Sequence, residues 1–241
     1  IAECLVGSEM CIRDRYLTGA TNLEPSGKIA NYLSATLSLG DSATLVCEWP
    51  ISNRVRQPVE ISGHNENGQE DSFLLRGRID RVDEINVEGQ ADGQRLIIIR
   101  DMKTVNGPKL NQRGQRHRKA IFDELQLALY AKAWEAANPN DRVVGVGITE
   151  VGDDTEYYVE MDPEYIDSVQ HMSIGKITTY TSMTYRDIDE KTGGSSNGFR
   201  AWLDERVRTA LRVIGGAKAG HVNPTVSAVS YTHLTLPTKS G

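Results

Sequence analysis

Residues 73–83, FLLRGRIDRVD, carry the clearest structural pattern in the chain. Apolar and polar side chains alternate along this stretch, which is the two-residue period of a strand buried on one face. Asp80 therefore points away from the side of Ile79. Further along, residues 96–99 form an unbroken apolar run, as expected of a central strand covered on both faces. The two stretches predict neighbouring strands of one sheet.

The second of these strands ends in charged residues. Asp101 and Lys103 lie two apart, so both point to one side of the sheet, and Met102 points to the other. Carboxylates brought together from adjacent strands raise each other's pKa unless a divalent cation lies between them. Oxygen ligands suit Mg²⁺ or Mn²⁺, and Mg²⁺ typically takes one or two carboxylates plus substrate phosphate. Lys103 can then orient the attacking water or stabilise charge on a phosphate.

Each feature also has an ordinary structural interpretation. An Asp-x-Lys at a strand end is usually a solvated edge, and Asp80, between Arg78 and Arg81, could form a surface ion pair. Gln126 and Tyr130 lie four apart, on one face of a helix predicted over residues 120–137. They could be polar members of a buried helix, although a buried amide needs hydrogen-bond partners.

The ordered set nevertheless resembles the PD-(D/E)XK nuclease superfamily over residues 59–142. It consists of a Gly-x-Ile-Asp strand, an apolar strand ending in Asp-x-Lys, and a helix carrying Gln-x-x-x-Tyr. Within the superfamily the set is similar to the RecB-like branch, which includes the nuclease domains of RecBCD- and AddAB-type helicase-nucleases and the CRISPR-associated exonucleases. The resemblance implies an α/β fold with a central mixed β-sheet flanked by helices, a restriction-endonuclease-like core.

The resemblance also implies a role for each residue. It implies a Mg²⁺- or Mn²⁺-dependent DNA nuclease, the exonuclease domain of a helicase-nuclease that acts in recombination or double-strand break repair. DNA and a helicase domain or subunit are then the partners, with no membrane involved. The implied metal ligands are Asp80, Asp101 and the Met102 carbonyl, Lys103 is the catalytic lysine, and Gln126 and Tyr130 form the branch-specific catalytic motif.

One departure from the branch supports an alternative function. Many RecB-like nucleases carry a metal-binding histidine on a helix before the first aspartate, and the first histidine after the start of this chain is His64, in a Gly- and Asn-rich turn. The alternative is therefore a catalytically inactive nuclease-like domain that binds DNA ends or a partner. Glu60 could be a third acidic ligand, but an exposed strand carboxylate is the simpler interpretation.

Charge is distributed unevenly along the chain. The formal net charge is −6, which does not exclude DNA binding, because the local field at the site matters more than the total. A basic cluster follows the Asp-x-Lys directly, where it could contact the DNA backbone, or could be a solvated loop. The predicted DNA-binding residues are Lys109, Arg113, Arg116, Arg118 and Lys119.

The two ends do not have the pattern of natural protein. Residues 5–14 and 229–238 resemble one sequencing adapter translated in opposite directions, so residues 1–15 and 228–241 are interpreted as adapter-derived. The natural part, residues 16–227, is long enough for a single domain, with a core over about 57–160 and C-terminal helices over 163–219. Cys47 is then its one cysteine, which supports neither a disulfide framework nor an iron-sulfur cluster and favours the reducing cytoplasm.

Other elements follow from apolar periodicity and turn residues. No apolar run approaches the length of a membrane span. Beyond the elements above, the sequence predicts helices over 26–40, 164–180 and 199–214, and strands over 43–49, 58–62, 143–151 and 155–161.

Overall fold

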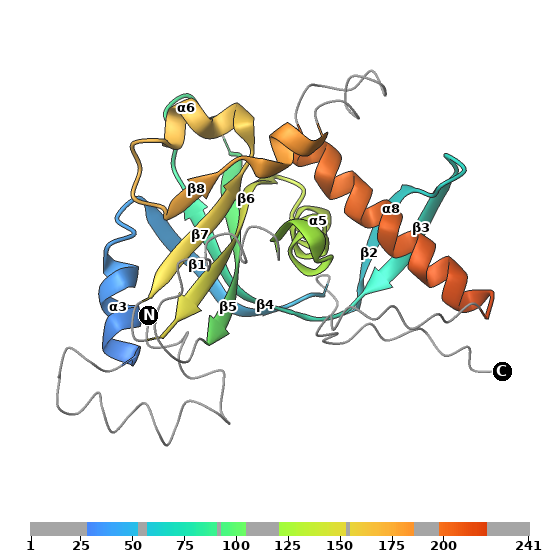
Figure 1. Cartoon of the computed structure of the whole chain (residues 1–241), viewed down its shortest axis with the longest axis horizontal. Helices are drawn as coiled ribbons and strands as arrows, with labels where there is room; N and C mark the ends of the chain where they lie inside the picture. Colours follow the sequence, from blue (N-terminus) through green and yellow to red (C-terminus); the bar gives the residue numbers. More distant parts are fainter. Residues whose placement is uncertain are drawn as a thin grey trace.

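A six-stranded mixed sheet forms the centre of the computed structural model, which describes residues 28–52, 57–90, 93–104, 121–152, 155–185 and 198–220. The strands are β1 (Ser42–Pro50), β4 (Arg78–Ile85), β5 (Arg95–Thr104), β6 (Asp141–Val151), β7 (Glu156–Met161) and β8 (Lys176–Thr178). They lie in the order β1-β4-β5-β6-β7-β8 (Figure 1). β5 pairs with β6 in parallel and β7 with β8 in parallel, whereas the other three pairings are antiparallel. The predicted α/β fold with a central mixed sheet is confirmed.

Helices cover the sheet. They include α3 (Lys28–Leu37), α5 (Gln126–Ala137), the short turn η1 (Pro163–Tyr165), α6 (Ile166–Val169) and α8 (Gly198–Lys218), with further helical turns at residues 121–123 and 180–185. α5 connects the parallel strands β5 and β6, as such a crossover requires, and its apolar residues join the largest core cluster with those of α8. That cluster includes Ile97 and Ile99 of β5, whereas Leu96 and Ile98 belong to a second cluster. β5 is therefore buried on both faces, as its apolar run predicted.

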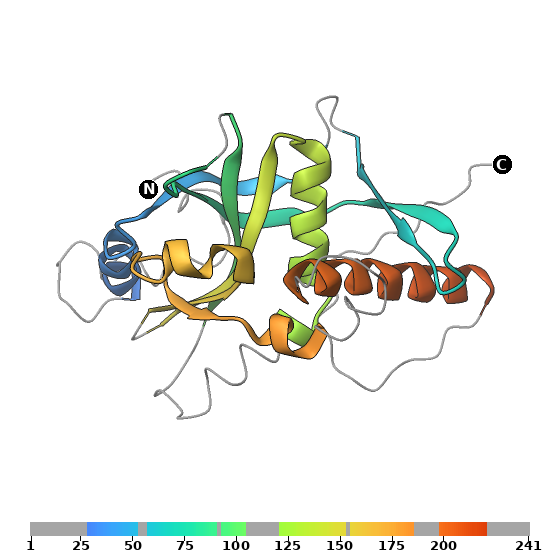
Figure 2. The same ribbon diagram turned by 90° about the horizontal axis from the view of Figure 1, so that it is seen from above.

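A two-stranded hairpin lies beside the main sheet. It consists of β2 (Val59–His64) and β3 (Glu70–Leu75), which pair only with each other among the described strands. α8 packs against this hairpin at the side of the molecule away from α3 (Figure 2). The predicted single strand over residues 73–83 is thus wrong in its extent, because the chain leaves the hairpin after Leu75 and enters the main sheet at Arg78.

Two predicted helices also need correction. The helix expected over 120–137 is interrupted at residues 124–125, so that α5 begins at Gln126. The helix expected over 164–180 ends at Val169, and Gly175, whose φ of +118° is unfavourable for other residues, lets the chain turn into β8. The central sheet extends beyond the core that was predicted over about residues 57–160. Its strand β1 lies before residue 57 and its strand β8 lies after residue 160.

Cys47 differs from the expectation of a reduced cysteine, because it is disulfide-bonded. That expectation depended on setting aside the cysteines of the first 15 residues. Residues 1–27 and 221–241, which hold both adapter-like segments, are outside the described part of the chain. Among the helices that the structure does describe, none is long and apolar enough to cross a membrane.

The sheet contains one backbone approach that only glycine allows. A Cβ at Gly147 on β6 would overlap the carbonyl oxygen of Tyr158 on β7. We expect Gly147→Ala to lower the free energy of unfolding by about 1–3 kcal/mol, measured by urea denaturation. Gly215→Ala is the matched control, because a Cβ there meets nothing within 4 Å, and in a helix it should stabilise by about 0.5–1 kcal/mol. Equal stability of Gly147→Ala and the parent would contradict this packing.

Candidate active site

The pairing of β4 with β5 brings Asp80 and Asp101 together. Arg81 pairs with Arg100, and one step further in the same register Asp80 stands opposite Asp101. Side chains directly opposite on antiparallel strands lie on the same face. Oδ2 of Asp80 also accepts a hydrogen bond of 2.7 Å from the backbone N–H of Met102. The Asp80 carboxylate therefore lies against the end of β5 that carries Asp101.

Asp101 is held by two further residues of the predicted set. Its Oδ2 lies 2.7 Å from Nζ of Lys103, and its Oδ1 accepts a hydrogen bond of 3.1 Å from Nε2 of Gln126. Gln126 is the first residue of α5, and its Nε2 also donates to the hydroxyl of Tyr130 at 3.2 Å. The structure thus brings Asp80, Asp101, Lys103, Gln126 and Tyr130 into one cluster.

The exposure of these groups differs sharply. The Asp101 side chain is 6 % exposed and that of Lys103 is 42 % exposed. The Lys103 side chain is consequently half-exposed, whereas both oxygens of the buried Asp101 are engaged by protein groups. Tyr130 is buried in the core cluster beneath it. Met102 packs its side chain against the cluster of Tyr32, Leu39 and Tyr157 on the other face, as its position in the strand predicted.

The two carboxylates of the cluster lie beside the positive charge of Lys103, and their crowding shifts the pKa values of several groups. Burial, and then the charge of Asp101, raise the pKa of Asp80 to about 7, against the lowering effect of the Met102 hydrogen bond. Burial lowers the pKa of Lys103, but the charge and hydrogen bond of Asp101 outweigh it and the net shift is upward. Burial also raises the pKa of Tyr130. An added cation beside Asp80 would favour its ionised form.

Glu48 is a neighbour of the site that the sequence analysis missed. On β1, Cys47 pairs with Arg81 and Trp49 with Ile79, so Glu48 stands opposite Asp80, and its charge contributes to the raised pKa of Asp80. Its φ of +53° is uncommon for a residue other than glycine. No local pattern in the sequence marks this position, because its placement depends on pairing with a strand 30 residues later.

The structure also decides between interpretations that the sequence left open. Arg78 pairs with Glu48 at 2.9 Å, and Arg81 pairs with Asp83 at 2.6 Å, so neither forms the surface ion pair with Asp80 that the sequence allowed. Glu60 is exposed on the β2–β3 hairpin, where its Oε1 accepts a hydrogen bond from Ser72. This agrees with the simpler interpretation of Glu60 as a surface carboxylate.

Gly77, the first residue of the Gly-x-Ile-Asp pattern, has a packing reason. A Cβ at this position would lie 3.3 Å from Cδ1 of Ile51 and 3.6 Å from the hydroxyl of Tyr130. The first of these distances is tighter than ordinary van der Waals contact, so a larger side chain would press against Ile51, whereas the contact with Tyr130 would be of ordinary length. The glycine thereby allows the strand that leads to Asp80 to lie close to Ile51.

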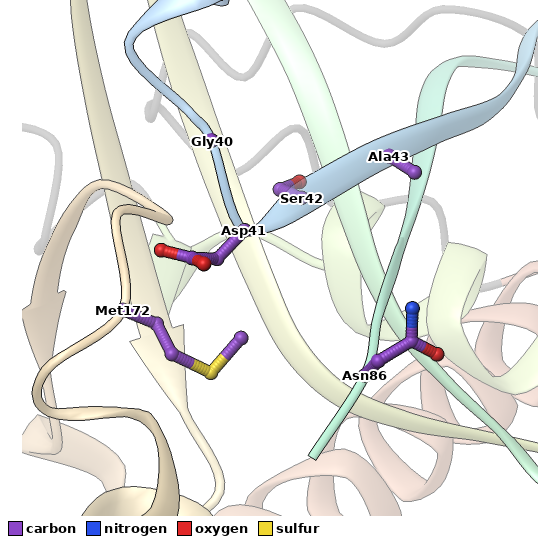
Figure 3. Close-up of a pocket in the computed structure, with 6 residues that line it drawn as sticks. All are labelled: Gly40, Asp41, Ser42, Ala43, Asn86 and Met172. Atoms are coloured by element: carbon purple, nitrogen blue, oxygen red, sulfur yellow. The ribbon is translucent and has the colours of Figure 1, made fainter.

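The remaining predicted residues lie elsewhere or outside the described chain. Lys109, Arg113, Arg116, Arg118 and Lys119 belong to residues 105–120, which the structure does not describe, so their predicted contact with DNA stays a prediction. A pocket of about 260 Å³ is lined by Asp41, Ser42, Asn86 and Met172 together with Gly40 and Ala43 (Figure 3). It lies at the opposite ends of β1 and β4 from Glu48 and Asp80, so it is separate from the candidate site.

The chemistry of the donor set fits a hard divalent cation. Within the described residues, no three His, Cys, Asp or Glu side chains form a complete metal site. Two carboxylates and a backbone carbonyl are nevertheless what Mg²⁺ commonly takes from a protein, since it retains waters and binds substrate phosphates. The residues that would hold it are Asp80 and Asp101, with the Met102 carbonyl as the predicted further ligand.

A comparison with protein-family models identifies the family of the chain. The model of a family described as the PD-(D/E)XK nuclease superfamily matches residues 20–226, which is most of the chain and includes every residue of the candidate site. No curated protein matches the chain.

Proposed function

Because the chain belongs to the PD-(D/E)XK nuclease superfamily, we propose that it is a divalent-cation-dependent DNA nuclease that hydrolyses phosphodiester bonds at the Asp80–Asp101–Lys103 cluster. Members of the superfamily are generally nucleases, and the mixed sheet flanked by helices agrees with their restriction-endonuclease-like fold. The observation that carries the proposal is the contact of Asp101 with both Lys103 and Gln126, beside an Asp80 carboxylate of raised pKa.

Each residue of the cluster has a distinct task in this proposal. Asp80 and Asp101 hold Mg²⁺ or Mn²⁺, which supplies charge neutralisation at the phosphate and an activated water. Lys103 lies beside Asp101 with its ammonium partly exposed, where it can contact the scissile phosphate and stabilise the charge that develops there. Its positive charge also offsets the two carboxylates when the phosphate approaches.

Gln126 and Tyr130 act through Asp101. The amide of Gln126 donates to one Asp101 oxygen and to the Tyr130 hydroxyl, which fixes the plane of the carboxylate. The position of Gln126 at the start of α5 also directs the partial positive charge of the helix N-terminus toward Asp101. These contacts hold Asp101 in place, whereas the Lys103 side chain is 42 % exposed, so it can meet substrate.

The proposed branch of the superfamily, and with it the kind of nuclease and its biological setting, rests on the resemblance to RecB-like nucleases. Gln126 and Tyr130 stand four apart and face Asp101, which supports the branch-specific motif and, with it, an exonuclease domain of a helicase-nuclease. The proposed setting is recombination or double-strand break repair in the cytoplasm, with DNA as substrate and a helicase as partner. The basic residues between Lys109 and Lys119 are proposed to contact the DNA backbone.

The proposal is tested by incubating the chain with end-labelled linear duplex and single-stranded DNA. We expect shortening of labelled strands with Mg²⁺ or Mn²⁺ and none with chelator, because the cation supplies the activated water. Binding should weaken steeply with salt, since it depends on contacts with phosphates. A chain that binds DNA ends but leaves them intact with either cation would be the non-catalytic domain instead.

A further inference from the structure

Three buried charged residues lie on the face of the sheet opposite the candidate site. Arg81, Asp83 and Arg100 are each at most 2 % exposed. Nε of Arg81 lies 2.6 Å from Oδ1 of Asp83, and Nε of Arg100 lies 2.6 Å from Oδ2. The nuclease chemistry proposed above uses none of them. We call these three residues the buried triad.

The buried triad connects two neighbouring strands next to the site residues. Arg81 follows Asp80 on β4, Arg100 precedes Asp101 on β5, and Arg81 and Arg100 are paired residues of the two strands. Like charges directly opposite in a sheet repel. The single carboxylate of Asp83 compensates both guanidinium groups, and so it ties β5 to β4 one residue away from the candidate site.

The surroundings fix the buried triad from several elements. Arg100 donates to the carbonyl of Ile174 at 2.8 Å, and Ser42, at the pocket of Figure 3, donates to Asp83 at 2.9 Å. Both guanidinium groups lie over the ring of Tyr157, at 5.8 Å and 5.2 Å. Nη1 of Arg100 has no hydrogen-bond partner within the described residues. Such an arrangement is held rigidly, although burying charges rarely increases stability.

The apolar pattern of β5 leaves its register open. Leu96, Ile97, Ile98 and Ile99 are all at most 1 % exposed, so β5 presents apolar side chains to both faces. A shift of one residue would still bury apolar groups on both sides, whereas it would turn Asp101 to the wrong face. Hydrophobic burial alone therefore does not align Asp101 with Asp80.

We propose that the buried triad is a positioning device that sets the register of β5 against β4 and thereby places Asp101 opposite Asp80. The proposal rests on the proposed function only for naming these two carboxylates as the site. The register of β5 against β4 can be followed through the 2.7 Å hydrogen bond from the Met102 amide to Asp80, which exists only when the two strands are aligned.

Arg100→Met is the sharpest test, because it leaves Arg81 and Asp83 as a balanced ion pair while it removes the link between strands, together with the hydrogen bond to Ile174 and the contact with the Tyr157 ring. Arg95→Met is the matched control: it lies on the same strand, and its partner Asp141 belongs to β6 instead of β4. Amide hydrogen exchange of Met102 is measured by NMR without metal or DNA, alongside urea denaturation. Asp80→Ala shows how far exchange accelerates when the acceptor itself is lost.

The expected result is at least tenfold faster exchange of the Met102 amide in Arg100→Met than in Arg95→Met, approaching the rate in Asp80→Ala. If Arg100→Met does not fold, the triple change Arg81→Met, Asp83→Leu and Arg100→Met gives the same comparison with no charge left unpaired. The proposal would be overturned if the Met102 amide exchanged at the parent rate in whichever of these variants folds. A loss of protection in a chain that never cleaves DNA would overturn the proposed function alone.

Discussion

Replacing Lys103 with Met should reduce the single-turnover rate of DNA cleavage by about 10²–10³-fold, as loss of one preorganised charge at a reacting phosphate typically does. Asp101→Asn should abolish measurable cleavage, because it removes a proposed cation ligand and the charged partner of both Lys103 and Gln126. DNA affinity should change little in either variant, since it is spread over many backbone contacts. Cleavage rates and filter-binding affinities of the variants check both halves of this expectation.

Lys132→Met is the matched control for the lysine change. Lys132 lies on α5, and its ammonium pairs with Asp204 on α8 at 2.5 Å, away from the site cluster. The Lys132→Met variant should cleave DNA at the parent rate. Equal losses in Lys103→Met and Lys132→Met would show that lysine replacement harms the fold in general, and full activity of Lys103→Met would remove Lys103 from the chemistry.

The largest stability effect is expected at Asp83, which is fully buried between two arginines. Asp83→Asn removes the one negative charge and leaves two buried guanidinium groups uncompensated. Breaking a buried ion pair in this way costs about 3–5 kcal/mol of the free energy of unfolding, measured by urea denaturation. Glu66→Gln is the control, since the exposed pair of Glu66 with Arg212 should contribute at most about 1 kcal/mol. Similar losses for both variants would contradict the account.

Acidification should neutralise the same carboxylate that Asp83→Asn removes. Burial raises the pKa of Asp83, but the charges of Arg100 and Arg81 outweigh it and hold the pKa below its ordinary value of 3.8. A carboxyl with a depressed pKa stabilises the fold above its unfolded pKa, and this contribution is lost as the pH falls through the folded pKa. The parent should therefore lose stability on acidification below about pH 4, and Asp83→Asn should lose less over that range.

That the residues of the candidate site lie close together could be predicted from the sequence, because the signals are local. Asp101 and Lys103 end an apolar run, so their common side follows from strand geometry alone. Gln126 and Tyr130 are one helical turn apart, so their common face also follows from spacing. The nuclease superfamily could be recognised from these short patterns, and the family match agrees with it.

Features that depend on pairing between distant segments were not predictable in this way. The alternation from Phe73 to Ile79 continues smoothly across a change of sheet, and only Gly77 hints at the break. The approach of Glu48 to Asp80, and of Arg100 to Asp83, requires knowing which strands are neighbours and in which register. The apolar residues around 120–137 likewise do not reveal the interruption before Gln126.

The most direct test of the central claim is a calorimetric titration of the chain with Mn²⁺ in the absence of DNA. If Asp80 and Asp101 hold one cation together, Asp80→Asn and Asp101→Asn should each weaken Mn²⁺ binding by at least about tenfold. Glu60→Gln, which removes an exposed carboxylate of the β2–β3 hairpin, should bind as the parent does. Unchanged Mn²⁺ affinity in both aspartate variants would contradict the shared site.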